Sequence, residues 1–315
     1  MAHETMDIDL VYLWVDGNDP EWLAKHNACV GKMEAKSATD CKGRYADNDE
    51  LKYSLRSIEK YAPWIHRIFI VTDNQTPAWL DTSDPKIRIV DHSEIMPAVS
   101  RPCFNATVIE HFICDIPGLA EHFLFANDDM FINRPVTPET FFAEDGLPII
   151  RFNRRPFRKF TLWYKEKVQG KKLSNYIQII RNAAELVERK YGKYYGGKTH
   201  HNIDAYLKSD CQHVERMFRK EIEPTLTNHV RSANDIQRNL FAYVALAEKR
   251  AHLHYVGQRT SFRLHIQNES HYAKLERYNP MLFCMNDSQY AGDADREREK
   301  AWLERRFPEK SRFEK

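Results

Sequence analysis

The alternation of short apolar runs with helix-like segments over the first 150 residues constrains the fold more than any other feature of the sequence. The runs are rich in aliphatic and aromatic residues and are bounded by Asp, Asn, Gly or Pro, which is typical of strands buried in a parallel sheet. They cover residues 9–15, 67–72, 87–90 and 122–126. The sequence therefore predicts a Rossmann-like α/β fold, in which helices flank a mostly parallel sheet.

Helical spacing marks one segment between these runs and several segments after them. Residues 49–61 place Leu51, Leu55 and Ile58 on one face of a predicted helix. Further helices are expected at residues 173–190, 203–221, 233–251 and 294–307. This change of character predicts three regions, which are an α/β half at residues 1–150, a basic flap or linker at 151–200 and a mainly helical half at 201–315 that completes the site.

The formal net charge of +2 conceals an uneven distribution of charged residues. Residues 151–200 contain 14 lysines and arginines against three glutamates. Such a segment is expected to meet an anion, which could be a phosphate, an acidic polymer, a membrane surface or a nucleic acid. The alternative interpretation is a solvated surface without a partner.

Hydropathy and cysteine usage indicate the compartment. No apolar run approaches the ~18 residues that span a bilayer, and the first residues lack the basic and apolar regions of a signal peptide. The six cysteines are scattered, with neither a C-x-x-C pair nor metal-ligand spacing, so buried reduced thiols are expected. These features predict a cytoplasmic protein that is neither transmembrane nor secreted.

Acidic residues follow two of the predicted strands at the edge where α/β sheets bind their ligands. The turn DGND begins at Asp16, and Asn127, Asp128 and Asp129 follow the fourth strand. The triplet offers hard oxygen ligands for a divalent cation bound to a diphosphate. An Asp pair at a strand end is also a common turn or helix-cap device. No glycine-rich phosphate loop is present, which disfavours a dinucleotide or P-loop site.

A few single residues could also carry chemistry, and each has a structural alternative. Asp16 could meet a ribose, a metal-bound water or a reacting hydroxyl, although Asp-Gly is also a plain turn. Arg56 lies on the polar side of the predicted helix and, from the sequence alone, is a surface residue. His200 and His201 follow a basic, glycine-containing stretch, where an imidazole could accept a proton from a hydroxyl. Most histidines, however, are ordinary surface or core residues.

Several stretches together closely resemble the Stealth family of sugar-1-phosphate transferases. The longest reads RYADNDELKYSLRSIEKYAPWIHRIFIVTDNQTPAWL at residues 44–80. The others read IDLVYLWVDGNDPEW, IVDHSEIMP, IPGLAEHFLFANDDMFI, VRSANDI and FCMND. The family includes bacterial capsular and exopolysaccharide phosphotransferases and the catalytic subunit of the animal lysosomal-enzyme N-acetylglucosamine-1-phosphotransferase. The resemblance implies a GT-A-like fold whose first half binds a nucleotide sugar.

The resemblance also implies a reaction. An acceptor hydroxyl attacks the β-phosphate of a UDP-hexose or UDP-N-acetylhexosamine, UMP leaves, and a phosphodiester forms in a cell-surface polysaccharide. The cofactor would be Mg²⁺ or Mn²⁺. Two alternatives stay open, a nucleotide-sugar glycosyltransferase that releases UDP and a nonenzymatic module that binds polyanions.

By position, the resemblance assigns roles to individual residues. Asp128 and Asp129 would hold the metal, with Asp16 as an optional further ligand. Arg56 and Arg231 would stabilise phosphate oxygens, and His201 would be the general base, with Asp16 or Glu110 as alternative bases. His201 is preferred to His200 because the family has a basic residue seven positions after its histidine, here Lys208, although the family's proline is absent. The predicted substrate-binding residues are Asn105, Glu110, Asn127, Lys208, Asp235, Asn286 and Asp287.

The basic segment suggests the partner. Residues 151–198 are expected to hold an anionic acceptor, either a phosphate-containing glycan or a lipid-diphosphate-linked oligosaccharide. The same segment could attach the protein peripherally to the inner face of a membrane. No nucleic-acid recognition motif is visible, so nucleic acid is not expected as a partner, and a homo-oligomer is possible.

Overall fold

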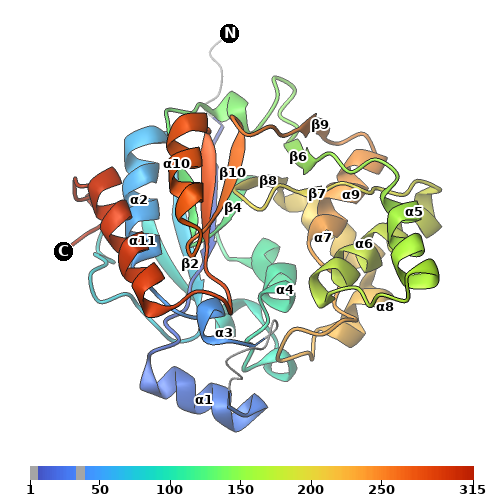
Figure 1. Cartoon of the computed structure of the whole chain (residues 1–315), viewed down its shortest axis with the longest axis horizontal. Helices are drawn as coiled ribbons and strands as arrows, with labels where there is room; N and C mark the ends of the chain where they lie inside the picture. The colour runs from blue at the N-terminus through green and yellow to red at the C-terminus, as the bar shows by residue number, and fades with distance from the viewer. Residues whose placement is uncertain (1–5, 33–39) are drawn as a thin grey trace.

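The computed structural model describes residues 6–32 and 40–315, with a five-stranded sheet at its centre (Figure 1). The strand order is β3-β2-β1-β4-β8. The first four are parallel to one another, and β8 runs antiparallel to β4 at the edge. Their bounds are Ile8–Leu13 (β1), Ile68–Thr72 (β2), Ile87–Asp91 (β3), His122–Asn127 (β4) and Asp204–Leu207 (β8). The predicted α/β architecture and its four strands are confirmed.

Apolar side chains cover both faces of this sheet, as parallel strands require. Successive side chains of a strand point to opposite faces. Leu10 and Tyr12 of β1 therefore pack with Leu55 of helix α2 (Glu50–Tyr61), whereas Val11 packs in the other apolar cluster, with the helices of the second half. The helix predicted over residues 49–61 is thus present, and its predicted apolar face is the buried one.

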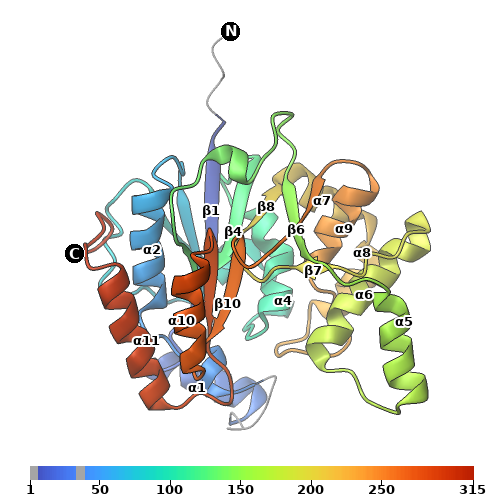
Figure 2. The ribbon, with the colours of Figure 1, turned by 45° about the horizontal axis from the view of Figure 1, so that its top comes forward.

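A second sheet, with the order β10-β11-β5, lies beside α2 (Figure 2). It consists of β5 (Met130–Ile132), β10 (Ser261–His265) and β11 (Leu282–Asn286), with α10 (Glu269–Tyr278) and α11 (Asp293–Arg306) packed around it. Phe131 and Phe283 stack with ring centroids 4.7 Å apart, and Trp302 of α11 packs edge-on against Phe283. Since β5 follows β4 after a two-residue turn, that turn lies at the junction of the two sheets.

The remaining chain forms a helical layer and a small sheet, β7-β6-β9 (Figure 1). The strands are β6 (Ile149–Asn153), β7 (Lys198–Thr199) and β9 (His252–Tyr255). The longer helices are α6 (Asn175–Tyr191), α7 (Lys208–Met217) and α9 (Asn239–Ala247). The shorter ones are α5 (Arg158–Trp163), which continues into a π-helical turn at Tyr164–Val168, and α8 (Arg219–Ile222). Three helices of the first half complete the set, α1 (Pro20–Val30), α3 (His92–Ile95) and α4 (Ala106–Ile109).

Two predicted helices differ from the structure. Residues 203–221 do not form one helix, because the sequence DAYL pairs with β4 as β8 and buries all four of its residues. The helix predicted over 233–251 is reduced to α9, since Asp235 accepts a hydrogen bond from the backbone N–H of Ser232 and holds the preceding residues in a loop. The domain boundaries at 150 and 200 remain predictions, and β8 completes the central sheet from beyond residue 200.

The helices were also compared with the length and apolarity that a bilayer requires. Within the described ranges, none is both long enough and apolar enough to cross a membrane. The longest, α6, has 17 residues and carries Arg181, Arg189 and Lys190.

Candidate active site

The carboxyl ends of β1, β4 and β11 open into one cleft of about 910 Å³. The chain reaches this cleft from the turn between β4 and β5, from the segment before β8, from the loop before α9 and from the end of β11. Seven of the predicted site residues line it, namely Asn127, Asp128, Asp129, His201, Arg231, Asn286 and Asp287. Segments far apart in the sequence thus place polar groups in a single cavity.

One part of the cleft is crowded with carboxylates, which we call the acidic wall: Glu50, Asp128, Asp129 and Asp287. Burial and the charges of Glu50 and Asp129 raise the pKa of Asp128 well above its ordinary value. Burial, followed by the charge of Asp47, raises the pKa of Glu50 to about 8. Burial also raises the pKa of Asp129 to about 6. Carboxylates held this closely must share protons or be neutralised by a cation.

Glu299 of α11 adds a further buried carboxylate to this group. Its side chain is fully buried, and its Oε1 has no hydrogen-bond partner in the described part of the chain. The amide of Asn48 donates to Oε1 of Glu50 at 2.8 Å and to Oε2 of Glu299 at 3.4 Å, and so links the two acids. Burial and the charges of Glu50 and Asp287 raise the pKa of Glu299 well above its ordinary value.

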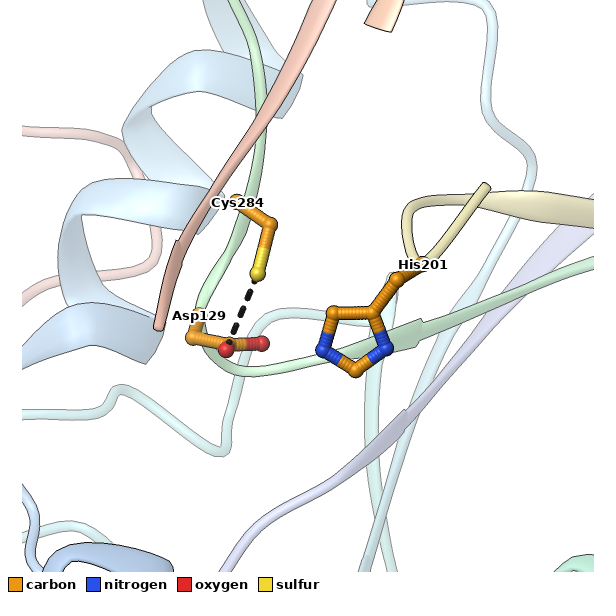
Figure 3. A group of neighbouring side chains, drawn as sticks. All are labelled: Asp129, His201 and Cys284. Carbon is orange, nitrogen blue, oxygen red and sulfur yellow. Dashed lines mark hydrogen bonds between the residues drawn. The ribbon is translucent and has the colours of Figure 1, made fainter. Parts of the chain in front are cut away.

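Asp129, His201 and Cys284 converge from three different segments (Figure 3). The Cys284 thiol donates a hydrogen bond to Oδ2 of Asp129 at 3.1 Å, and Oδ1 of Asp129 is buried without a partner among the described residues. Ligand atoms of the three side chains all lie within 4.8 Å of one another. This group could hold a metal ion. The oxygens of the acidic wall suit Mg²⁺ or Mn²⁺, whereas the thiol and imidazole suit softer metals.

His201 contributes a neutral imidazole to the cleft. Burial, and then the positive charges of Arg263 and Arg238, lower the pKa of His201 well below its ordinary value. Its φ of 58° lies in the left-handed region, which is uncommon for a residue other than glycine and recurs at functional sites. His200, by contrast, is buried, with its Nε2 3.3 Å from the carbonyl oxygen of Ile203. The structure thus brings His201 into the cleft, and a neutral imidazole there can accept a proton.

Guanidinium groups also line the cleft, from Arg44, Arg231 and Arg263. Burial, followed by the charge of Arg231, lowers the pKa of Arg44 to about 10. Within residues 6–32 and 40–315, Arg231 has no hydrogen-bond or ion-pair partner. A guanidinium offers five N–H donors in a rigid fork, and phosphate oxygens match that geometry. We call these three arginines the basic wall.

Asn105 and Asp235 hold the loop that presents Arg231, and neither lines the cleft. Both are fully buried. The amide of Asn105 donates to Oδ2 of Asp235 at 2.8 Å and to the carbonyl oxygen of Val230 at 3.2 Å. Oδ2 of Asp235 also accepts from the backbone N–H of Ser232 at 2.9 Å. These polar atoms bond the loop, and the direct substrate contact predicted for the two residues stays a prediction.

Glu110 is buried beside Arg238, a residue that the sequence analysis did not single out. Nε of Arg238 lies 3.4 Å from Oε1 of Glu110, and its Nη1 donates to Oδ2 of Asp204 at 2.6 Å. Burial raises the pKa of Glu110, against the charges of Arg238 and Arg231. Glu110 does not line the cleft. It belongs to the charged group next to His201, since Arg238 is one of the charges that keep His201 neutral.

Arg56 and Lys208 do not line the cleft, and the roles predicted for them stay predictions. Nε and Nη2 of Arg56 each donate to Glu314 at 2.7 Å, and Nη1 donates to the carbonyl oxygen of Phe307 at 2.6 Å. The C-terminal segment thus occupies the whole guanidinium. Lys208 follows β8 at the end that pairs with the start of β4, and four residues of strand separate it from the cleft by roughly 13 Å.

Asp16 adopts the turn geometry that was the structural alternative. Its Oδ1 accepts a hydrogen bond from the backbone N–H of Asn18 at 2.8 Å, and Gln75 bonds both the backbone N–H and the carbonyl oxygen of Asp16. Gly17 is required next to it, because a Cβ there would lie 2.6 Å from Cβ and O of Tyr45. Asp16 does not line the cleft, although its charge helps to raise the pKa of Asp47.

Asn286 is the last residue of β11, and Asp287 of the acidic wall follows it. The amide of Asn286 donates to the backbone oxygen of Asp287 at 2.6 Å. Arg296 donates to both carboxylate oxygens of Asp287, at 2.7 and 3.2 Å. Asp287 is thus already paired, whereas the amide oxygen of Asn286 can accept a donor in the cleft.

Glu50, Glu299, Arg44, Arg263 and Cys284 are the other residues of the site that the sequence analysis missed. Glu50 is the first residue of α2, in the run DNDEL, which by itself indicates only the start of a helix. Cys284 lies inside the block FCMND, whose last two residues alone were assigned. No sequence spacing links Glu299 to the strands, because tertiary packing of α11 brings it there.

The comparisons with known proteins show the family of the chain. Stealth protein CR1, conserved region 1, matches residues 6–34, and Stealth protein CR2, conserved region 2, matches residues 44–150. An exopolysaccharide phosphotransferase of Streptomyces coelicolor is 36% identical over 98% of this chain and 52% of its own length. The chain therefore belongs to the Stealth family, as the resemblance predicted.

Two further relatives show the same pattern. The capsular polysaccharide phosphotransferase cps1A of Actinobacillus pleuropneumoniae is 38% identical over 73% of this chain and 62% of its own length. The exopolysaccharide phosphotransferase CpsY of Mycobacterium tuberculosis is 35% identical over 98% of this chain and 58% of its own length. The chain thus spans about half to three fifths of the length of these relatives.

Among solved structures, the galactosyltransferase LgtC in complex with donor and acceptor sugar analogues covers 94% of this chain and 94% of its own. Its TM-score is 0.43 and its sequence identity is 12%. This similarity is too distant to carry any statement about activity.

Proposed function

We propose that this chain is an enzyme that transfers a hexose- or N-acetylhexosamine-1-phosphate from a UDP-sugar to a hydroxyl of a glycan acceptor, with release of UMP. The product is a phosphodiester in a cell-surface polysaccharide. The observation that carries the proposal is one cleft that combines a carboxylate-rich wall, a neutral imidazole and an unpaired guanidinium. Phosphoryl-type transfer needs these functions: charge neutralisation, alignment and a proton acceptor. The names of the relatives, exopolysaccharide and capsular polysaccharide phosphotransferases, support it.

His201 is the general base of this reaction. The acceptor oxygen attacks the phosphorus that carries the sugar, and the bond between this phosphorus and the oxygen that bridges the two phosphates breaks. UMP leaves with the bonding electron pair, and the hydroxyl proton passes to a ring nitrogen of His201. The low pKa of His201 keeps that nitrogen free of a proton before the attack.

Arg231 binds the phosphate oxygens whose charge changes during the transfer. Its guanidinium has no protein partner in the described chain, so no ion pair has to break when a phosphate binds. Arg263 lines the same cleft and adds a second positive charge. Asn105 and Asp235 act through the loop that fixes the position of Arg231.

The acidic wall fits a divalent cation, Mg²⁺ or Mn²⁺. Asp128 and Asp129 would hold it, with Glu50 next to them, and the unpaired Oδ1 of Asp129 is the group that most needs a ligand. When bound, the cation supplies further neutralisation of the diphosphate. Asn127 and Asn286 are left to bind the donor by hydrogen bonds.

The acceptor meets the enzyme at the basic segment, and this segment also attaches the protein to the inner face of a membrane. Phe157, Phe160 and Trp163 are 82%, 60% and 51% exposed, in a stretch rich in lysine and arginine. Aromatic and cationic side chains together favour an anionic membrane surface. Sedimentation with anionic vesicles tests this point, and lack of binding at low salt would contradict it.

The experiment that tests the function is a donor panel. Purified protein is incubated with Mg²⁺ or Mn²⁺, each common UDP-sugar and a cell-envelope glycan extract, and the released nucleotides are separated. Acceptor-dependent release of UMP supports the proposal and names the donor. Release of UDP would instead assign the chain to the glycosyltransferases.

A further inference from the structure

A second pocket, of about 320 Å³, lies between α5, α6 and the segment before β7. We call it the basic pocket. It shares Tyr176 and Arg263 with the catalytic cleft, so the two cavities are neighbours. Its other polar lining includes Arg155, Arg158 and Lys198.

Four of the five cations that line this pocket form no ion pair with the described carboxylates. Within the described ranges, Arg155, Arg158, Lys198 and Arg263 form no ion pair, while Arg181 at the same pocket is paired with Glu166 and Glu185. Burial, and then the charges of Arg263, Arg155 and Arg158, lower the pKa of Lys198 to about 8. Cations that repel one another at such close range are stabilised when an anion binds between them.

The pocket also contains an unsatisfied buried donor. Tyr195 is 7% exposed, its ring stacks on Tyr243 at a centroid distance of 5.5 Å, and its hydroxyl has no hydrogen-bond partner in the part of the chain that is described. Gly196 lets the backbone pass against α5, since a Cβ there would lie 2.6 Å from Cβ of Arg158. Arg158, Lys198 and Arg263 are partly buried in this pocket, and Arg155 is exposed.

The position of His201 indicates whether this pocket binds the donor or the acceptor. The acidic wall, where the donor diphosphate is placed, lies just after β4 and β11 and at the start of α2. Lys198 precedes His201 by only three residues, on the other approach to the cleft. The acceptor hydroxyl must reach His201. We propose that the basic pocket binds a phosphate ester of the acceptor. This phosphate ester lies next to the acceptor group that carries the attacking hydroxyl. This inference rests on the proposed function.

Two sources could supply this phosphate ester: the phosphodiester of a growing glycan or the diphosphate of a lipid-linked glycan. Inorganic pyrophosphate and dimethyl phosphate serve as probes for the two sources. Their binding to the full chain is measured by isothermal titration calorimetry, and binding of UDP is measured in parallel. Preference for dimethyl phosphate indicates the glycan chain, and preference for pyrophosphate indicates the lipid carrier.

Arg158→Gln and Arg155→Gln are the test variants, and Lys167→Gln is the matched control, because Lys167 is an exposed cation of the neighbouring π-helical turn that does not line the pocket. Arg155 is itself exposed, so its replacement leaves the fold intact. We expect each test variant to weaken binding of the preferred probe at least tenfold, with UDP affinity within about twofold of wild type and the control unchanged (roughly tenfold per 1.4 kcal/mol).

Three results would overturn the inference. The wild-type protein could bind neither probe, the test variants could bind both probes as the wild type does, or they could lose affinity for UDP to the same extent, which would assign the pocket to the donor. All of these readouts are binding constants. They therefore stand apart from the transfer assay, and a failure of the proposed activity can be told from a failure of this pocket.

Discussion

The acidic wall and the basic wall face the same cleft but are built in opposite ways. The carboxylates of the acidic wall crowd one another, and burial raises the pKa values of Asp128, Asp129 and Glu50. Arg231 of the basic wall has no partner within the described chain. Asp287 of the acidic wall is paired with Arg296, whereas Asp128 and Asp129 form no ion pair with the described residues. A metal ion on one side and phosphate groups on the other would supply the opposite charge to each wall, which explains why the two walls are not simply paired with each other.

The largest effect is expected from His201, which lies between the walls. His201→Gln keeps a polar side chain but cannot accept the proton, so turnover should fall by about 10²–10⁴. The transfer rate at saturating donor measures this, with thermal unfolding as the check on folding. His213→Gln, at an exposed histidine paired with Glu248, is the control. Wild-type turnover of the His201 variant would exclude the histidine as the base.

The next effect tests the acidic wall. Asp128→Asn removes a metal ligand, and we expect transfer to fall by about 10²–10³. The metal-free variant should be at least as stable as the wild type, because one of the crowded charges is gone. Rate assays with and without Mg²⁺ and a thermal melt in chelator give both readouts, with Asp145→Asn as a surface control. A marked loss of metal-free stability would show that Asp128 has a structural role instead.

The basic wall is tested by a substitution that keeps its charge. Arg231→Lys retains the positive charge and loses the fork, so one hydrogen bond to a charged phosphate is lost, about 1.5–3 kcal/mol or roughly 10–150-fold in rate. Steady-state kinetics measure the loss, and Arg277→Lys on α10 is the matched control. An unchanged rate would mean that Arg231 acts only through its charge.

Arg56 sharpens the comparison because its guanidinium, unlike that of Arg231, is fully paired. Arg56→Gln leaves Glu314 buried without its partner, and we expect a loss of about 3–5 kcal/mol in the free energy of unfolding. Turnover per folded molecule should stay within about twofold. Urea unfolding and active-site-normalised kinetics separate the two effects. A loss of rate without a loss of stability would support the catalytic role that the sequence predicts.

The smallest effect concerns pH and metal together. Folding raises the pKa values of Asp129 and Glu50 to about 6 and about 8, so the metal-free protein loses stability as pH rises from about 4 towards 8. Mg²⁺ competes with these protons. It should therefore raise the melting temperature more at pH 8, on the order of 5 °C, than at pH 6. An equal shift at both pH values would indicate that the metal does not bind at these carboxylates.

The central fold is predictable because its strands are continuous apolar runs. Such runs are buried on both faces, and few other structures than a strand of a parallel sheet fit them. β8 is not predictable in the same way, since DAYL is too short to favour strand over helix until it pairs with β4. The first part of the helix predicted over residues 233–251 does not form, because Asp235 makes local hydrogen bonds to the loop instead of helical ones. Both errors arise because tertiary contacts decide these structures, and the local periodicity of the sequence does not reveal such contacts.

The residues of the site also fall into those that the sequence predicts and those that depend on tertiary packing. The residues at strand ends, such as Asp128 and Asn286, are predictable because the carboxyl edge of a sheet fixes where they lie. Arg56 and Lys208 share the family pattern, but their positions on α2 and after β8 place them elsewhere. Arg263 was missed because only the packing of β10 brings it to the cleft, and Glu299 because only the packing of α11 buries it near Glu50. The position of a residue in the sequence therefore identifies the site residues at the strand ends. It does not identify the neighbouring charged residues that set the pKa values of those groups.

The central claim is that the sugar travels together with its phosphate, and the position of a label tests it most directly. Each UDP-sugar that gives turnover is prepared with ³²P in the β-phosphate, which carries the sugar, and is incubated with the enzyme and the acceptor extract. We predict that the label appears in the glycan and that unlabelled UMP is released. Recovery of the label in free UDP would contradict the claim, because the bond broken would then be the one between the sugar and its phosphate.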